Sequence, residues 1–173
     1  MRDAFIAKGH DARSCDLLPT EREGPHWQGD LLEVINQGWD MAIFHPPCTH
    51  LAVSGARWFK DKVVEQREAI DFFMKLVNAP IPRIAIENPI GIMSTRYRKP
   101  DQIVHPWWFG KYGENESKAT CLWLKGLPKL IPDHPLPPPH NQSIWRMGPS
   151  PERSKERSRT FMGVANAFAE QWG

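Results

Sequence analysis

Cysteine is scarce in this sequence, with three residues in 173, at positions 15, 48 and 121. Their odd number and wide spacing exclude a disulfide framework, and no Cys-x-x-Cys or closely spaced histidine pair accompanies them, as a zinc site would require. The sequence therefore predicts no metal site and a reducing compartment. Each cysteine is then either a small buried apolar residue or a nucleophile, and we expect burial for two of the three.

Long hydrophobic runs are also missing. No stretch approaches the roughly 20 apolar residues needed to span a bilayer, and residues 1–16 carry early acidic residues without the apolar segment of a signal peptide. Charge of one sign is not in excess either, because 22 basic residues stand against 20 acidic ones. Bulk electrostatics alone implies no polyanion partner, and the composition predicts a soluble, cytoplasmic protein.

Proline and tryptophan, by contrast, are abundant, with 17 and 8 residues respectively. The length, compared with roughly 150 residues per domain, predicts a single domain over residues 1–173. Residues 131–139 hold five prolines, which indicates an extended, polyproline-like connection within residues 130–150. Apolar residues then recur at a helical period toward the C-terminus and predict a closing helix over residues 159–173.

Short apolar runs bounded by proline alternate with one amphipathic segment. Residues 40–44 and 83–86 have the pattern of strands, and the apolar positions between residues 63 and 77 fall near helical spacing. This order predicts a strand–helix–strand crossover with parallel strands. Residues 120–124 indicate a further strand, residues 12–15 a weaker one, and residues 2–8 a helix. The predicted fold class is α/β.

The two best-defined strands each end in a short polar motif. Pro46, Pro47 and Cys48 follow the first strand, and Glu87 and Asn88 follow the second. Since parallel neighbours present their carboxyl ends at one edge of a sheet, where ligands bind in such folds, we expect Cys48 and Glu87 to be neighbours. Two explanations remain open: a thiolate that attacks an electron-poor pyrimidine ring held by a protonated carboxyl, or a structural cysteine beside a capping glutamate.

The surrounding residues carry a family resemblance. Residues 46–55 (Pro-Pro-Cys-Thr-His-Leu-Ala-Val-Ser-Gly) resemble the catalytic loop of DNA cytosine-C5 methyltransferases, and residues 86–94 (Ile-Glu-Asn-Pro-Ile-Gly-Ile-Met-Ser) resemble that family's glutamate–asparagine motif. Residues 29–31 (Gly-Asp-Leu) are similar to its glycine–aspartate turn, and residues 163–167 (Gly-Val-Ala-Asn-Ala) to its closing motif. Together with Asp16, five motifs in the family's order indicate a small, phage-type member.

The resemblance implies a Rossmann-like, S-adenosylmethionine-dependent methyltransferase fold with a mostly parallel sheet. The implied activity is transfer of a methyl group from S-adenosylmethionine to cytosine in DNA, in duplex or single strand. Cys48 would add to C6 of cytosine, Glu87 would hold the base, and Asn88 would brace the loop. The implied cofactor-binding residues are Asp16, Asp30, Pro46 and Asn166.

The sequence departs from the family before residue 1, where a strand and a glycine-rich turn are expected, so we expect an N-terminally truncated form of the fold. A partner subunit or self-association would then complete the sheet. The alternative function is a non-catalytic descendant that binds nucleic acid or nucleotide.

For contact with DNA, the expected basic residues are Lys118, Arg153, Lys155 and Arg157. Trp107, Trp108 and Phe109 either stack on bases or belong to the core, and we favour the core.

Overall fold

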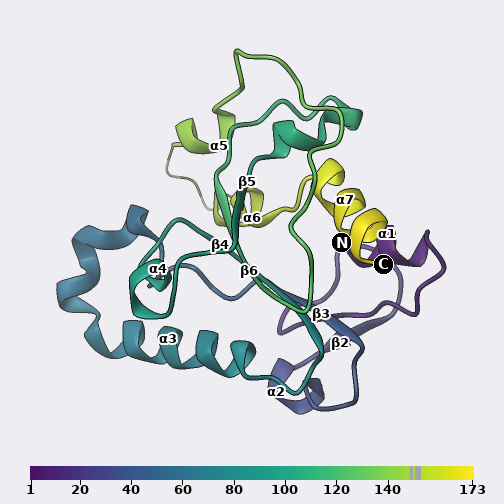
Figure 1. The fold of residues 1–173 in the computed structure, drawn as a ribbon. Coiled ribbons are helices and arrows are strands. Elements are labelled where there is room, and N and C mark those ends of the chain that lie inside the picture. The colour runs from purple at the N-terminus through teal and green to yellow at the C-terminus, as the bar shows by residue number, and fades with distance from the viewer. Residues whose placement is uncertain (149, 151–152) are drawn as a thin grey trace. The chain divides into compact units, whose positions relative to one another are not determined.

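The computed structural model describes residues 1–148, 150 and 153–173 (Figure 1). The contacts divide the chain into two compact units. One comprises Ile35–Val104 and Ala119–Lys129 and is called here the sheet unit; the other comprises Met1–Val34, His105–Lys118 and Leu130–Gly173 and is called the terminal unit. Both mix helices and strands, which confirms the α/β class, while the single domain remains a prediction.

The sheet unit contains a four-stranded sheet in the order β3-β4-β6-β5. Its strands are β3 (Met41–Phe44), β4 (Arg83–Pro89), β5 (Gln102–Val104) and β6 (Thr120–Lys125). β3 and β4 are parallel and are joined through α3 (Val63–Val77), which confirms the predicted crossover.

The prediction of a mostly parallel sheet is wrong, because β6 runs antiparallel to both of its neighbours, β4 and β5. The chain passes from β4 through α4 (Met93–Arg96) to the edge strand β5, and returns as β6 between the two. An apolar run shows that a strand forms but carries no information about its direction, so the pattern of residues 120–124 did not reveal this pairing.

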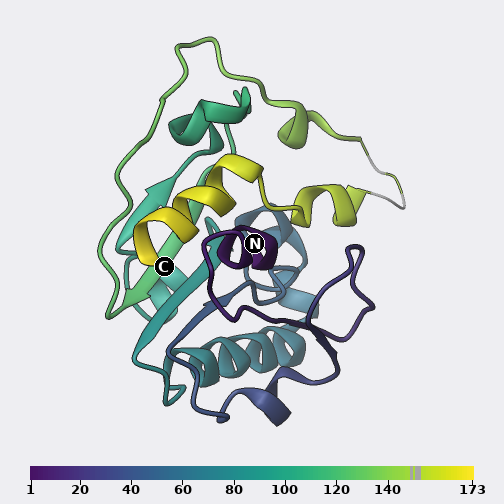
Figure 2. The same ribbon diagram turned by 90° about the vertical axis from the view of Figure 1, so that its right-hand side faces the viewer.

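Helix α3 covers one face of this sheet (Figures 1 and 2). Successive strand residues point to opposite faces, so Ile84 and Ile86 share a face of β4, and Trp123 lies opposite Ile86 on β6. The ring of Phe73 on α3 meets the Trp123 ring edge-on at a centroid distance of 5.2 Å. These side chains are all at most 2% exposed and form the centre of the unit's core.

The terminal unit contains a second, two-stranded parallel sheet and several short helices. The strands are β1 (Ser14–Asp16) and β2 (His26–Gln28). The helical segments are α1 (Arg2–Ile6), α2 (Leu31–Val34), the 3-10 segment η2 (Pro106–Tyr112), α5 (Ser143–Arg146), α6 (Arg153–Ser158) and α7 (Met162–Trp172). Helix α7 packs against α1 and η2 (Figure 2). A helix does form in the predicted closing segment, but it begins at Met162 and not at residue 159.

None of the helices within the described ranges combines the length and the apolar character that a bilayer crossing requires.

Candidate functional site

The parallel pairing of β3 and β4 ends at Phe44 and Ile86, but β4 continues to Pro89 in its pairing with β6, so Glu87 and Asn88 lie within the strand and not after it as predicted. The parallel register pairs Phe44 with Ile86, so the next residues, His45 and Glu87, are neighbours at the same edge. The His45 Nδ1 atom lies 3.0 Å from the Glu87 Oε2 atom, a hydrogen-bonding distance. The expected meeting of the two polar motifs at one sheet edge is therefore confirmed.

The segment after β3 turns sharply at Cys48. The carbonyl oxygen of Cys48 accepts hydrogen bonds from the backbone N–H groups of Leu51 at 3.0 Å and Ala52 at 2.9 Å. The Leu51 side chain is fully buried and anchors the turn, while Cys48 is half-buried. The 3-10 segment η1 (Val53–Asp61) follows. The turn thus presents Cys48 just beyond the strand end, where a ligand of the sheet edge would lie.

Two backbone hydrogen bonds join this segment to the one that follows β4. Val53 donates to the carbonyl of Ile90 at 3.1 Å, and Ile92 donates to the carbonyl of Leu51 at 2.9 Å. Between them Gly91 lies so close to the backbone of Leu51 that a Cβ atom there would collide with the Leu51 carbonyl oxygen. The glycine is therefore required by the close approach of the two segments.

Asn88 makes a third connection between the segments. Its side chain is 1% exposed, and its Nδ2 atom donates to the carbonyl oxygen of Pro46 at 2.9 Å. Pro46 lies beyond the last pair of the parallel ladder, Phe44 and Ile86, and a side-chain donor from the neighbouring strand satisfies its carbonyl. Asn88 and Pro46 thus brace the two segments, whereas direct contact of Pro46 with a cofactor stays a prediction.

The other two cysteines are poor nucleophiles. Burial, together with the nearby charge of Glu87, raises the pKa of the Cys121 thiol to about 11. Burial also raises the pKa of Cys15, and the carboxylates of Asp16 and Asp30 act in the same direction. Since the thiolate is the reactive form, the raised pKa values disfavour Cys15 and Cys121 as nucleophiles.

Asp16 and Asp30 lie together in the terminal unit, at the carboxyl edge of the β1–β2 pair. The N–H of Gly29 donates to the carbonyl oxygen of Asp16 at 3.0 Å, which holds the two strand ends together. Each aspartate is exposed and accepts one backbone N–H through its Oδ1 atom, at 2.9 Å in both cases: Leu18 bonds Asp16 and Leu32 bonds Asp30. Two exposed carboxylates at one strand edge suit a ligand with hydroxyl or amino donors.

The remaining predicted site residues lie in or beside α6 and α7, also in the terminal unit. Asn166 donates from Nδ2 to the carbonyl of Met162, within α7, at 2.9 Å. Lys118 donates from Nζ to the backbone carbonyl of Arg157 at 2.9 Å. The side chains of Arg153 and Lys155 lie outside the described residues. The role of the basic residues in DNA binding stays a prediction.

The aromatic side chains of η2 pack against other residues of the terminal unit. The Trp107 ring stacks on the His140 imidazole, with centroids 4.3 Å apart and planes 7° apart, and it also stacks on His105 at 5.9 Å. Phe109 is 2% exposed. Burial and the nearby His140 lower the pKa of His105, whose Nδ1 atom has no hydrogen-bond partner among the described residues. Phe109 therefore belongs to the core, whereas Trp107 and Trp108 are half-buried and their stacking on bases is not tested.

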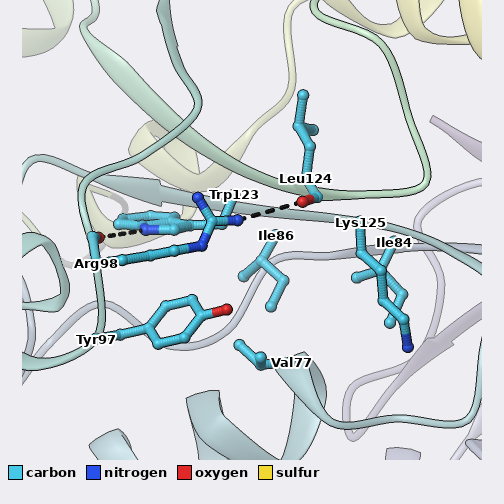
Figure 3. Close-up of a pocket in the computed structure, with 8 residues that line it drawn as sticks. All are labelled: Val77, Ile84, Ile86, Tyr97, Arg98, Trp123, Leu124 and Lys125. Carbon is cyan, nitrogen blue, oxygen red and sulfur yellow. Dashed lines mark hydrogen bonds between the residues drawn. The ribbon is translucent and has the colours of Figure 1, made fainter.

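A pocket of about 200 Å³ opens on the α3 side of the sheet (Figure 3). It is lined by Val77, Ile84, Ile86, Tyr97, Arg98, Trp123, Leu124 and Lys125. Its polar groups bond one another: Trp123 donates from Nε1 to the Arg98 carbonyl at 2.8 Å, and Arg98 donates to the Leu124 carbonyl at 3.2 Å. Ile84 and Ile86 point away from the face that carries Glu87, so this pocket is separate from the Cys48–Glu87 edge.

Sequence reasoning missed the contact of His45 with Glu87, although His45 was visible beside the cysteine. The signal that would have found it is the parallel register, in which His45 and Glu87 each follow the last paired residues, Phe44 and Ile86. Among the described residues, no group of three or more histidine, cysteine or acidic side chains is placed to hold a metal ion.

Comparisons with protein-family models, curated proteins and solved structures found no match to this chain. Its function is therefore inferred from its own residues and their geometry.

Proposed function

We propose that this chain is a DNA cytosine-C5 methyltransferase-like protein that transfers a methyl group from S-adenosylmethionine to cytosine, with Cys48 as the nucleophile. The observation that carries the proposal is the bracing of the Cys48 segment against the segment after Glu87, through Asn88 and the two backbone hydrogen bonds. Such bracing fixes a thiol and a carboxyl relative to each other, which a two-residue attack on a base requires. A Rossmann-like methyltransferase fold is part of the proposal and is supported by the parallel β3–β4 pair joined through α3.

The chemistry assigns one role to each side chain. The Cys48 thiolate forms a bond to C6 of cytosine, and the electron pair of the C5–C6 double bond moves so that C5 becomes nucleophilic. The Glu87 carboxyl gives its proton to the ring nitrogen and accepts a hydrogen bond from the exocyclic amino group. After C5 has taken the methyl group, a water molecule from solvent takes the C5 proton. The C5–H electron pair re-forms the C5–C6 double bond, the bond from C6 to sulfur breaks with its electron pair returning to the Cys48 thiolate, and the ring nitrogen returns its proton to Glu87.

In a duplex, the target base must first leave the stack, which costs a few kcal/mol. The half-buried position of Cys48 beyond a strand end agrees with attack on a base presented from outside the sheet.

S-adenosylmethionine, when bound, supplies an electrophilic methyl group. Asp16 and Asp30 fit such a ligand, because their exposed carboxylates accept the hydroxyl donors of a ribose and the amino donors of an adenine. We assign the ribose to Asp16 and the adenine to Asp30. Asn166 remains a candidate for the same ligand, and Lys118 and Arg157 for the phosphates of DNA.

A covalent trap tests the proposal. A pool of random-sequence DNA duplexes in which 5-fluorocytosine replaces cytosine is incubated with the chain and S-adenosylmethionine, and the products are separated under denaturing conditions. Fluorine at C5 cannot leave as the proton does, so we expect a denaturation-resistant adduct. Cys48→Ser should abolish the adduct, and the matched variant Cys15→Ser should retain it.

A Glu87→Gln variant should slow adduct formation by about 10- to 100-fold, because the amide cannot give up a proton to the base; loss of a hydrogen-bonding partner costs about 1–3 kcal/mol. An adduct that Cys48→Ser forms as well as the wild-type chain would overturn the assignment. DNA binding without any adduct would instead support the non-catalytic alternative.

A further inference from the structure

The side chain of His45 lies within hydrogen-bonding distance of the Glu87 carboxyl. The two residues come from different strands, 42 positions apart in the chain, and are brought together by the parallel register of β3 and β4. The Glu87 side chain is 21% exposed and the His45 side chain 38% exposed, so the pair lies at the boundary between the sheet edge and solvent. A ligand that reaches Glu87 therefore approaches a carboxyl that is already engaged on one oxygen.

The two oxygens of this carboxyl are not equivalent. Oε2 lies 3.0 Å from His45 Nδ1, so in the neutral imidazole a proton on Nδ1 is donated to Oε2 and the ring keeps its lone pair on Nε2. A glutamate on a strand end has three rotatable bonds, and a fixed partner for one oxygen removes most of that freedom. The proton that Glu87 gives to a base is then carried on Oε1.

Further titratable groups belong to the elements beside the pair. Cys121, on the neighbouring strand β6, is close enough to Glu87 for the carboxylate to raise the pKa of its thiol. His50 belongs to the Cys48 segment, and its carbonyl oxygen accepts a hydrogen bond from Gln66 at 3.2 Å. His45 is the histidine bonded to Glu87, so the orientation of the carboxyl depends on it.

We propose that His45 is a positioning residue of this site, which holds Oε2 of Glu87 and so directs Oε1 toward the ring nitrogen of the base. This inference rests on the proposed function for its substrate. His45 belongs to the site through its contact with Glu87, and it forms no covalent bond to the substrate.

Three variants separate positioning from folding and from direct chemistry. His45→Ala removes the donor; His45→Asn keeps an N–H donor near the place of Nδ1 but has no imidazole. His134→Asn is the matched control, because His134 pairs with the carboxylate of Asp133 in an exposed position of the terminal unit. The rate of adduct formation with the 5-fluorocytosine duplexes and the affinity for unmodified duplexes are measured for each.

We expect His45→Ala to slow adduct formation by about 10- to 100-fold, as a misplaced catalytic group does, with DNA affinity unchanged. His45→Asn should recover most of the rate, and His134→Asn should equal the wild-type chain. An adduct rate for His45→Ala equal to that of the wild-type chain would overturn the inference while leaving the proposed function in place. An Asn variant as slow as the Ala variant would also overturn it, because the imidazole itself would then be required.

A second measurement needs no activity. Long-range ¹H–¹⁵N spectra of the full chain report which ring nitrogen of each histidine carries the proton. Near neutral pH, we expect the Nδ1–H form of His45 in the wild-type chain and its loss in Glu87→Ala, with the other histidines unchanged. A His45 signal that does not respond to Glu87→Ala would refute the pairing. If the wild-type chain forms no adduct, the proposed function fails, and these spectra alone still decide whether His45 holds Glu87.

Discussion

At the β3–β4 edge, the backbone of a neighbouring segment restricts which side chain a position can hold. Gly91 has almost no room, because the Leu51 carbonyl oxygen occupies the place of a side chain. The buried side-chain amide of Asn88 donates a hydrogen bond to the Pro46 carbonyl. Both residues connect the Cys48 segment to the Glu87 segment, so substitutions there should affect the site and the stability together.

Gly91→Ala tests this connection. The added methyl group must push the Leu51 carbonyl away, which should lower the free energy of unfolding by about 1–3 kcal/mol, as overpacking typically does. The variant should also slow the Cys48-dependent adduct, since the two segments can no longer approach. Urea denaturation and the covalent trap measure the two effects.

Gly148→Ala is the matched control, because a Cβ atom there would meet nothing within 4 Å. It should change the stability by no more than about 0.5 kcal/mol. Equal stabilities of the two alanine variants would show that the segments are not in the close contact described.

Among the elements, α7 begins in an unusual way. Its N-cap residue, Phe161, has no side chain able to cap, and the first N–H groups are satisfied from elsewhere in the chain. Glu114, which follows η2, accepts the N–H of Met162 on Oε1 at 2.8 Å and that of Gly163 on Oε2 at 2.7 Å. The carboxylate also lies at the positive end of the helix dipole. A residue 48 positions away thus completes the helix that carries Asn166.

Glu114→Gln should therefore destabilise the chain by about 1–2 kcal/mol, the usual cost of a lost cap. The amide retains one acceptor and turns an N–H₂ group toward the second helix N–H, where it cannot bond. Thermal and urea unfolding measure the effect. Glu170→Gln, in which an exposed pair with Lys8 at 3.5 Å is lost, should cost less than about 1 kcal/mol. A Glu114→Gln variant no less stable than this control would show that the cap contributes little.

The predictability of the elements follows from their local signals. β3, α3, β4 and β6 were predictable because apolar runs and proline boundaries mark them in the sequence. β2 and β5 were not, because they are three residues long and form strands only by pairing with β1 and β6. The direction of β6 was likewise not predictable from its own residues. At the site, the meeting of the two motifs followed from the crossover, whereas the pairing of His45 with Glu87 needed the register of the two strands.

On the scale of the whole molecule, the folded state depends on the protonation of groups that burial perturbs. Cys121 is 1% exposed and lies opposite Asn88 on the neighbouring strand. Its pKa rises from the ordinary 9.0 to about 11. The folded chain therefore binds the thiol proton more tightly than the unfolded chain does, and the protonated thiol contributes to stability only while the pH is low enough to maintain it.

This difference predicts an alkaline loss of stability. Below pH 9 both states keep the proton and the contribution is complete; between pH 9 and about 11 the unfolded chain loses it first, so the free energy of unfolding falls. Two pKa units correspond to about 3 kcal/mol. Cys121→Ala loses packing contacts, which should lower its stability at every pH. It also lacks the titrating thiol, so its free energy of unfolding should fall less steeply over this pH range. Urea unfolding of both chains from pH 8 to 11 measures the two slopes, and Cys48→Ala reports what a less buried thiol contributes. Parallel curves for the wild-type and Cys121→Ala chains would contradict the assignment, because the lysines and tyrosines that also titrate there are common to both.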